Sequence, residues 1–312
     1  MRKFLIITLL FSLSAYAQNK VGYALYSNMG TAYSGSKYTL PVLIDNEESI
    51  CNLQFDITLP YGVDICCGMD ERETETLLIT KGERTKASHA IACHKISERC
   101  YRIVVSSSDN AIFNDADKTL PMLYITLGIS NDATVGKNDI TFTHIVVSHY
   151  DANINKTSKH NVSDAVAAIQ IVKVHSIKVS SNDAALGLIE ISGDNYDPES
   201  ELAYDGSKVT LTAKPKEKCT FLKWEENGND LSSENPYTLT ITSDRDIQAV
   251  FAQCGDSNAD GFINVNDITN IATYILKGNA DMFYDKSADM NHDGIINVND
   301  IISIAKYILT EK

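Results

Sequence analysis

The chain has 312 residues and carries 27 Lys and Arg against 41 Asp and Glu, a formal net charge of −14, with 44% hydrophobic residues. This composition is typical of a globular protein with two or three domains and not of a disordered chain. The acidic excess argues against nucleic acid and anionic membranes as partners, because both are bound through clustered Lys and Arg.

The first 17 residues have the pattern of an export signal. Arg2 and Lys3 precede an apolar run over residues 4–13, and Ala15-Tyr16-Ala17 supplies the small residues that a signal peptidase accepts. The apolar run is too short to remain as a membrane-spanning helix, and no later segment reaches about 18 apolar residues. We therefore expect an exported protein, extracellular or at the cell surface, with no transmembrane segment after signal removal.

Seven cysteines follow the signal, and five of them precede residue 101. Export permits disulfides, but an odd number leaves one thiol without a partner within the chain. Cys93 and Cys100 are the pair we expect to close a short hairpin, although connectivity does not follow from sequence. A metal site made of His89, Cys93, His94 and Cys100 is the less favoured alternative, because it lacks the paired CxxC spacing of zinc sites.

Residues 18–173 show the period-two alternation of strands that are buried on one face. The runs at 38–44, 53–59 and 122–127 alternate in this way and are separated by Gly, Asn, Asp and Ser turns. This pattern predicts an antiparallel β-sandwich. The strand order and phrases such as QFDITLP and VGKNDITFTHI resemble cohesins and related carbohydrate-binding sandwiches; no binding residue is transferred on this basis.

Residues 174–253 contain shorter predicted strands with many Asp and Ser turns. The string from Tyr204 to Phe251 has a Gly-Ser before a VTLTA strand, an F-x-x-W strand and a closing AVF. It resembles the divergent internalin-type bacterial repeat domain, which implies a small β-fold used as a spacer or adhesion module. Cys219 departs from that family's pattern. Trp224 has two interpretations, a sugar-stacking ring or a core aromatic beside Phe221, and the core is favoured.

Residues 254–312 contain two copies of a calcium-loop pattern, DSNADGFINVND from Asp256 and DMNHDGIINVND from Asp289. Oxygens at positions 1, 3, 5, 7, 9 and 12 surround a hard cation, and the glycine at position 6 allows the sharp turn. The predicted ligands of two Ca²⁺ ions are Asp256, Asn258, Asp260, Phe262 (backbone), Asn264 and Asp267, then Asp289, Asn291, Asp293, Ile295 (backbone), Asn297 and Asp300. Calcium is expected to control folding of this segment.

Position 12 is Asp where the general EF-hand has Glu, and no helix is expected before either loop. Each loop leads into one helix, with core stripes of Ile268, Ile271, Ala272 and Ile275, then of Ile301, Ile304, Ala305 and Ile308, joined by Ile263 and Ile296. These features resemble the type I dockerin. The resemblance implies an all-α calcium-binding domain that binds a cohesin on a scaffold or surface protein. The matching partner-contact positions are Val265, Asn266, Val298 and Asn299.

The expected fold is multidomain and mainly β: an N-terminal antiparallel β-sandwich (18–173), a small β repeat domain (174–253) and a C-terminal dockerin with two loop–helix repeats (254–312). The expected function is non-catalytic recruitment of a binding module, with a polysaccharide as a further candidate ligand, to extracellular polysaccharide-degrading machinery. No GxSxG, HExxH or phosphate loop is present. A dockerin-tethered glycoside hydrolase, which needs only two carboxylates, and a calcium-rigidified surface adhesin stay open as alternatives.

Overall fold

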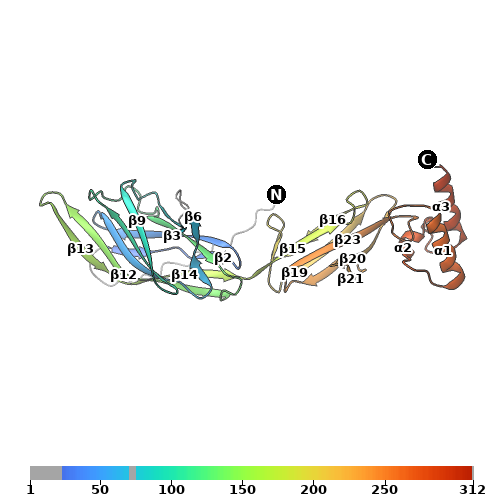
Figure 1. Cartoon of the computed structure of the whole chain (residues 1–312), viewed down its shortest axis with the longest axis horizontal. Coiled ribbons are helices and arrows are strands. Elements are labelled where there is room, and N and C mark those ends of the chain that lie inside the picture. Colours follow the sequence, from blue (N-terminus) through green and yellow to red (C-terminus); the bar gives the residue numbers. More distant parts are fainter. Residues whose placement is uncertain (1–22, 70–74, 311–312) are drawn as a thin grey trace. The chain divides into compact units, whose positions relative to one another are not determined.

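The computed structural model describes residues 23–69 and 75–310 (Figure 1). The predicted export signal, residues 1–17, lies outside these residues. Contacts divide the chain into two compact units, one ending at Val172 and the other beginning at Lys173. The second unit holds both the predicted repeat domain and the predicted calcium-loop segment. None of the described helices has the length and apolar character needed to cross a membrane.

The first unit is a sandwich of two β-sheets, as predicted. Its larger sheet has the order β2-β14-β12-β4-β10-β9, and β13 also pairs with β12. All of these pairings are antiparallel except that of β14 with β2. The strands are β2 (Gly30–Tyr33), β4 (Asn52–Thr58), β9 (His89–Ser97), β10 (Cys100–Ser107), β12 (Gly136–Asp151), β13 (Lys156–Val162) and β14 (Ala165–Val172).

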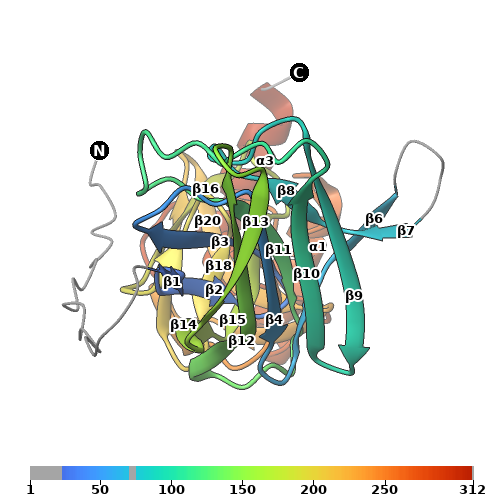
Figure 2. The same cartoon turned by 90° about the vertical axis from the view of Figure 1, so that its left-hand side faces the viewer.

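The smaller sheet has the order β1-β3-β11-β5, and β8 also pairs with β11. A separate hairpin of β6 and β7 stands away from both sheets (Figure 2). The strands are β1 (Tyr23–Tyr26), β3 (Lys37–Asn46), β5 (Val63–Ile65), β6 (Cys67–Met69), β7 (Glu75–Leu77), β8 (Ile79–Lys81) and β11 (Leu123–Ile129).

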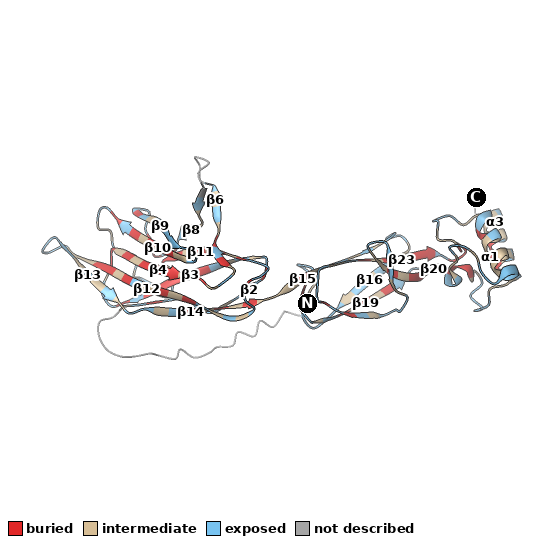
Figure 3. Ribbon diagram, turned by 60° about the horizontal axis from the view of Figure 1, so that its bottom comes forward, coloured by how far each residue is buried: buried red, intermediate tan, exposed pale blue. Residues whose placement is uncertain are grey.

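Burial alternates along these strands as the sequence predicts (Figure 3). In β11, Leu123, Ile125 and Leu127 are buried and the residues between them are partly exposed. The two sheets share one hydrophobic core, in which Phe55 and Phe142 meet edge to face at 5.7 Å. Because a strand's side chains point alternately to its two faces, this periodicity sets which residues fill the sandwich.

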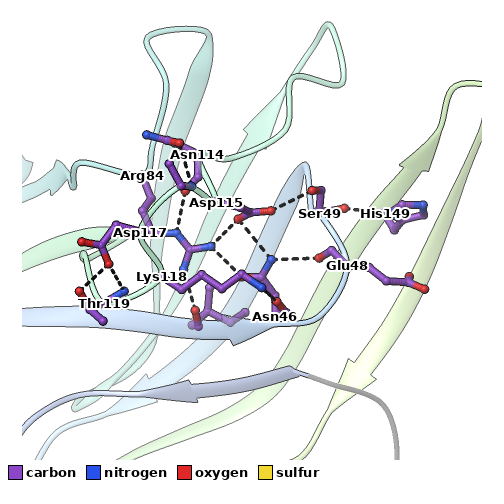
Figure 4. A network of polar contacts seen from close by, with 12 residues as sticks. Asn46, Glu48, Ser49, Arg84, Asn114, Asp115, Asp117, Lys118, Thr119 and His149 are labelled. Atoms are coloured by element: carbon purple, nitrogen blue, oxygen red, sulfur yellow. Dashed lines mark hydrogen bonds and ion pairs between the residues drawn. The ribbon is translucent and has the colours of Figure 1, made fainter.

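A buried polar network ties three separate segments of the sandwich together (Figure 4). Arg84 is fully buried and donates to the carbonyl oxygens of Ile44 (2.7 Å) and Asn114 (2.9 Å). Its Nη2 also donates to Asn46 Oδ1 and to Asp115 Oδ1, both at 2.6 Å. The guanidinium is therefore paired and hydrogen-bonded, which is the condition under which a buried charge is tolerated.

The same network extends outward from Asp115. Ser49 Oγ donates to Asp115 Oδ2 at 2.8 Å, and His149 Nδ1 lies 2.7 Å from the Ser49 carbonyl oxygen. Burial alone would raise the pKa of Asp115, but hydrogen bonds from Ser49, Arg84 and Asn46 outweigh it and lower that pKa. The network thus holds the long connection between β10 and β11 against the end of β3.

The expected Cys93–Cys100 disulfide is wrong. Cys93 pairs with Ile103 and Cys100 pairs with Ser97, so the two cysteines are separated by about 10 Å along the hairpin at the strand rise of about 3.3 Å per residue. A disulfide requires Cα atoms less than about 7 Å apart. Cys93 and Cys100 are both free thiols, and burial raises the pKa of Cys93 to about 11.

The second unit begins with the predicted repeat domain, which contains two sheets. The first has the order β17-β18-β15-β23-β20-β21 and the second β16-β19-β22. Trp224 is fully buried, 5.0 Å from the Phe221 ring, and its Nε1 donates to the Glu234 carbonyl oxygen at 2.9 Å, so it is a core aromatic. The strands are β15 (Val174–Ser181), β16 (Gly187–Ser192), β17 (Tyr196–Asp197), β18 (Leu202–Tyr204), β19 (Lys208–Pro215), β20 (Cys219–Glu226), β21 (Asn229–Ser232), β22 (Tyr237–Thr240) and β23 (Arg245–Gln253).

The helices of the described residues lie in the C-terminal segment, as predicted: α1 (Val265–Lys277), α2 (Asp285–Ala288) and α3 (Val298–Thr310). Two expectations are corrected here. The single turn α2 precedes the second loop, although no helix was expected there; four residues are too few to show a helical period. Ile275 is 38% exposed and lies outside the small core around Ile271, Ala288 and Ile304.

Candidate functional site

The first aspartate of each predicted calcium loop closes the loop by accepting backbone hydrogen bonds. Asp256 Oδ1 accepts from the Asp260 amide (3.2 Å) and Oδ2 from the Gly261 amide (3.0 Å). Asp289 makes the same two contacts with Asp293 (3.2 Å) and Gly294 (2.8 Å). Identical bonding at two places 33 residues apart shows that the local pattern of residues determines the loop conformation.

The last aspartate of each loop lies in the first turn of a helix. Asn264 is the N-cap of α1, and its Oδ1 accepts from the Asn266 amide at 2.8 Å, while Asp267 Oδ2 accepts from the Asn264 amide at 2.8 Å. This reciprocal pair is a capping box. Asn297 and Asp300 repeat it at α3, with distances of 2.7 and 2.9 Å. Positions 9 and 12 of the loop therefore also cap the N-terminus of the helix.

The loops bury negative charge that has no basic partner. Asp256, Asp267 and Asp300 are buried, and within residues 23–69 and 75–310 no Lys, Arg or His forms an ion pair with them. Burial, followed by the nearby carboxylates of Asp267 and Asp260, raises the pKa of Asp256. Ionised carboxylates that are buried without a counter-charge are costly, and a bound cation removes that cost.

The other predicted positions also lie in the two loops. Asn258 and Asp260 exchange side-chain contacts, with Asn258 Nδ2 donating to Asp260 Oδ2 at 3.0 Å, and Asn291 and Asp293 repeat this at 3.0 Å. The Phe262 and Ile295 carbonyl oxygens accept from the side-chain Nδ2 groups of Asn264 and Asn297. Carboxylate, amide and carbonyl oxygens are the donor set that calcium takes, so these residues fit that ion.

Each loop mixes carboxylates with neutral oxygen donors. In the described part of the chain, no three His, Cys, Asp or Glu side chains gather closely enough to bind a metal by themselves.

The less favoured zinc site at residues 89–100 is not supported by the structure. His89 is buried and Cys93 packs against the sandwich core, whereas His94, next to Cys93 on the same strand, is exposed.

Two further loop positions have left-handed backbone and were not predicted. Gly261 and Gly294 at position 6 have φ of 89° and 81°, as expected, but Ala259 and His292 at position 4 have φ of 56° and 59°. Residues with a Cβ rarely adopt this conformation. The left-handed backbone at position 4 could have been predicted only by comparison with a loop of known structure, because the two residues there, Ala259 and His292, share no feature that indicates it.

The first turns of α1 and α3 present the predicted partner residues to solvent. Val265 is 64% exposed and Val298 57% exposed, and Asn266 and Asn299 beside them are also exposed. Further apolar side chains are exposed along the same two helices, at Leu276 on α1 and at Ile302 and Leu309 on α3. Apolar residues exposed at equivalent positions of two repeats favour a protein-binding face.

The sandwich has an open surface cavity, lined by both polar and apolar atoms, that the sequence did not reveal. It has a volume of about 550 Å³ and is lined by Lys37, Tyr61, Asp64, Arg99, Gly128 and Asp132, among others. Tyr61 is 58% exposed, and its hydroxyl donates to Asp132 Oδ2 at 3.2 Å. Hydrogen bonding of the hydroxyl orients the ring while leaving much of it accessible, as in many ligand sites.

Comparison with protein families agrees with the sequence resemblance for the second unit. Residues 254–309 match the dockerin type I domain, and residues 186–255 match the divergent InlB B-repeat domain. The C-terminal segment is thus a type I dockerin preceded by a divergent InlB B-repeat. Type I dockerin domains are generally calcium-binding. A search of curated proteins gives no match.

Solved structures similar to the chain include three cohesins. A non-cellulosomal cohesin from Archaeoglobus fulgidus is 14% identical, covers 48% of this chain and 91% of its own, and has a TM-score of 0.34. The seventh ScaB type I cohesin from Pseudobacteroides cellulosolvens is 12% identical (49% and 94%, TM-score 0.39). A type I cohesin–dockerin complex from Clostridium thermocellum is 14% identical (48% and 99%, TM-score 0.36). These values are too low to carry an argument about binding.

Proposed function

We propose that this chain is an exported, non-catalytic protein whose dockerin binds a cohesin in a calcium-dependent manner. Through that contact it would recruit the β-sandwich unit to extracellular polysaccharide-degrading machinery. The observation that carries the proposal is the pair of loops with buried aspartates that lack a basic partner, in a segment that matches the type I dockerin. Binding a cation there neutralises the aspartates and completes the loops from which both long helices start.

Each loop would hold one Ca²⁺ ion. The proposed ligands are Asp256, Asn258, Asp260, the Phe262 carbonyl, Asn264 and Asp267 in the first loop, and Asp289, Asn291, Asp293, the Ile295 carbonyl, Asn297 and Asp300 in the second. The assignment is tested by calorimetry, in which Ca²⁺ is titrated into the full chain after chelator has removed bound calcium and has itself been dialysed away. The expected result is two sites per chain, with one lost in Asp267→Ala and the other lost in Asp300→Ala.

The proposed docking face is formed by Val265 and Asn266 on α1 and by Val298 and Asn299 on α3. These residues occupy equivalent positions in the two repeats and are exposed in both. Either repeat could therefore present the same pair of side chains to a cohesin. A single substitution would leave one copy intact, so substitutions in both repeats are needed to remove binding.

A binding panel of type I cohesins, measured with the full chain in calcium and in chelator, tests the docking function. We expect at least one cohesin to bind only in calcium, and Val265→Asp with Val298→Asp to weaken it by more than tenfold. Val135→Asp, on a similarly exposed valine of the sandwich, is the control and should bind normally. Absence of any calcium-dependent partner across the panel would contradict the proposal.

For the sandwich unit we propose carbohydrate binding at the cavity around Tyr61. An exposed aromatic ring that is held in orientation, with carboxylates and basic side chains around it, suits the apolar face and the hydroxyls of a sugar. Polysaccharide binding by the full chain tests this. Tyr61→Ala should remove binding, whereas Tyr61→Phe, which keeps the ring, should retain most of it.

The same samples separate the two alternatives. The cavity contains Asp64 and Asp132, so a glycoside hydrolase is the alternative that this observation favours. Release of reducing sugar by the wild-type chain, and its loss in Asp64→Asn or Asp132→Asn, would replace the binding function by an enzymatic one. A chain that binds calcium but neither cohesin nor sugar would favour the surface-adhesin alternative.

A further inference from the structure

The repeat domain and the dockerin are joined without a flexible linker. Strand β23 ends at Gln253, and the first calcium-loop residue, Asp256, donates its amide to the Gln253 carbonyl oxygen at 3.1 Å. Between them, the Cys254 amide donates to the Lys218 carbonyl oxygen at 2.9 Å, which continues the pairing of β23 with the start of β20. The first loop is thus a direct extension of the repeat domain's sheet.

The outer face of this sheet is covered where it meets the dockerin. Leu222 on β20 is 5% exposed and Ala252 on β23 is 2% exposed, yet neither belongs to the repeat domain's core or to the dockerin's core. A register irregularity between Phe221 and Lys223 lies at Leu222. Helix α2 of the dockerin packs against β20. Two buried apolar residues outside both cores indicate a separate interface between the domains.

Lysines of the two domains lie over each other's aromatic rings at this interface. Lys223 Nζ of the repeat domain lies 5.5 Å from the ring centroid of Tyr284, and Lys286 Nζ of the dockerin lies 5.8 Å from that of Phe221. Cation–π pairs of this kind contribute most where water is partly excluded. Lys223 is held further by ion pairs to Glu225 (2.7 Å) and Asp230 (2.6 Å).

A continuous series of contacts leads from the first calcium loop to β20. The Ser257 amide donates to Asp267 Oδ1 at 2.8 Å, and the Tyr284 amide donates to the Ser257 carbonyl oxygen at 2.9 Å. Tyr284 precedes α2 and carries the ring that lies under Lys223. The Gly255 amide also donates to the Ser287 carbonyl oxygen at 2.7 Å, so the loop and α2 hold each other at two points.

We propose that the repeat domain and the dockerin form one calcium-dependent cooperative unit, in which the first loop stabilises strands β20 and β23 through Ser257, Tyr284 and α2. The repeat is then a rigid base that sets the orientation of the dockerin. The inference rests on calcium binding by the loops but not on the identity of any cohesin partner. The expected effect of chelation changes accordingly. Loss of calcium should destabilise the repeat domain as well as residues 254–312.

The position of the single tryptophan makes the proposal measurable in the full chain. Trp224 lies on β20 in the core of the repeat domain, so its fluorescence reports unfolding of that domain alone. Thermal unfolding is followed by this signal in calcium and in chelator. We expect calcium to raise the Trp224 midpoint by roughly 5 °C or more, because a ligand stabilises every element that unfolds with its site.

Substitutions at the interface distinguish coupling from a general effect of calcium. Tyr284→Ala removes the ring under Lys223 and should reduce the calcium-dependent shift of the Trp224 midpoint by at least half, whereas Tyr284→Phe should retain it. Lys223→Ala should act like Tyr284→Ala, and the double variant should add little to either, since both remove the same contact. Lys214→Ala, which breaks the exposed Lys214–Glu190 pair elsewhere in the domain, is the matched control.

Helical circular dichroism at 222 nm, recorded on the same samples, separates the two ways in which the experiment can fail. No change in the helical signal on adding calcium means that the loops do not bind the ion, which contradicts the proposed function. A helical change with an unchanged Trp224 midpoint means that the domains are thermodynamically independent, and this overturns the inference. A normal helical response in Tyr284→Ala shows that this dockerin still folds.

Discussion

The sandwich unit and the dockerin both bury charged side chains, but they differ in where the counter-charge comes from. In the sandwich, Arg84 is fully buried and meets Asp115 from another segment of the same chain at 2.6 Å. In the dockerin, Asp267 and Asp300 are fully buried, and the described residues provide no basic side chain within ion-pair distance. One unit completes its buried ion pair by folding, whereas the other, under the function proposed above, would take its counter-charge from an ion in solution.

This difference shows how one chain can combine a domain stabilised by its own core with a domain whose stability depends on a bound ligand. The sandwich has an extensive hydrophobic core shared by two sheets. The dockerin core has three fully buried apolar residues, Ile271, Ala288 and Ile304, which is little for an independent domain. Stability supplied by a ligand is available only when that ligand is present.

Removal of calcium should have the largest effect of any change. Chelation leaves Asp256, Asp267 and Asp300 as buried carboxylates close to one another or to backbone dipoles, so α1 and α3 should lose most of their helical circular dichroism. The sandwich should keep its calorimetric transition within about 1 °C. If the sandwich transition moved as much as the helical one, the two units would not differ in the way described.

Arg84→Ala should have the largest effect in the sandwich. It leaves Asp115 without its buried counter-charge and should lower the free energy of unfolding by about 3–5 kcal/mol, the usual cost of breaking a buried pair. Calorimetry of the full chain in calcium measures it. Lys95→Ala removes the exposed pair with Asp64 and should cost much less, because solvent screens that pair. Equal losses in the two variants would show that the Arg84 network has no special role.

The dockerin core can be tested with two isoleucines of the same helix. Ile271→Ala should cost about 2–5 kcal/mol in the presence of calcium, because it opens a cavity in a fully buried site. Ile275→Ala should cost much less, since its side chain is 38% exposed. The helical melting midpoint in excess calcium compares them. A larger loss at Ile275 would support the sequence-based prediction that this residue belongs to the dockerin core.

The smallest effect concerns the pH dependence of the sandwich at His89. This residue is buried, stacks on Phe113 at 4.2 Å, and has no hydrogen-bond partner for either ring nitrogen among the described residues. Burial lowers its pKa, so the unfolded chain binds the proton first as pH falls below about 6.5. Stability is then lost with acidification, at a slope of up to about 1.4 kcal/mol per pH unit.

His89→Phe keeps the stacking and removes the titrating group, so it should flatten this pH dependence between pH 7 and pH 5. His94→Phe, at an exposed neighbouring position, is the control and should leave the slope unchanged. Calorimetric unfolding of the sandwich at several pH values gives the slopes. An unchanged slope in His89→Phe would assign the acid sensitivity to other groups, for example the carboxylate of Asp115.

Local patterns explain what could be predicted from sequence. The conformation of the two predicted calcium loops followed from sequence because each is formed by twelve consecutive residues whose carboxylates bond to amides a few positions away. The sandwich was predictable because burial on one face imposes period two on every strand, as along β11. The core role of Trp224 followed in the same way from its place on an alternating strand beside Phe221.

The features that could not be predicted depend on pairings between distant segments. Arg84 and Asp115 meet across 31 positions, and Tyr61 and Asp132 across 71. The separation of Cys93 from Cys100 depends on a strand register, and the packing of α2 against β20 joins elements that are far apart in the sequence. Such contacts depend on how whole sheets and domains pack together. The hydrophobic periodicity within a single strand or helix does not specify that packing.

By itself, therefore, the sequence determined the order of modules, the strand faces and the conformation of both aspartate-rich loops, because these depend on spacing within one element. Only the tertiary structure decided which charges are paired inside the chain, where the sandwich has a cavity, and that the repeat domain packs against the dockerin. The physical reason is that burial and counter-charge are properties of neighbours in space, and those neighbours come from segments that the sequence keeps far apart.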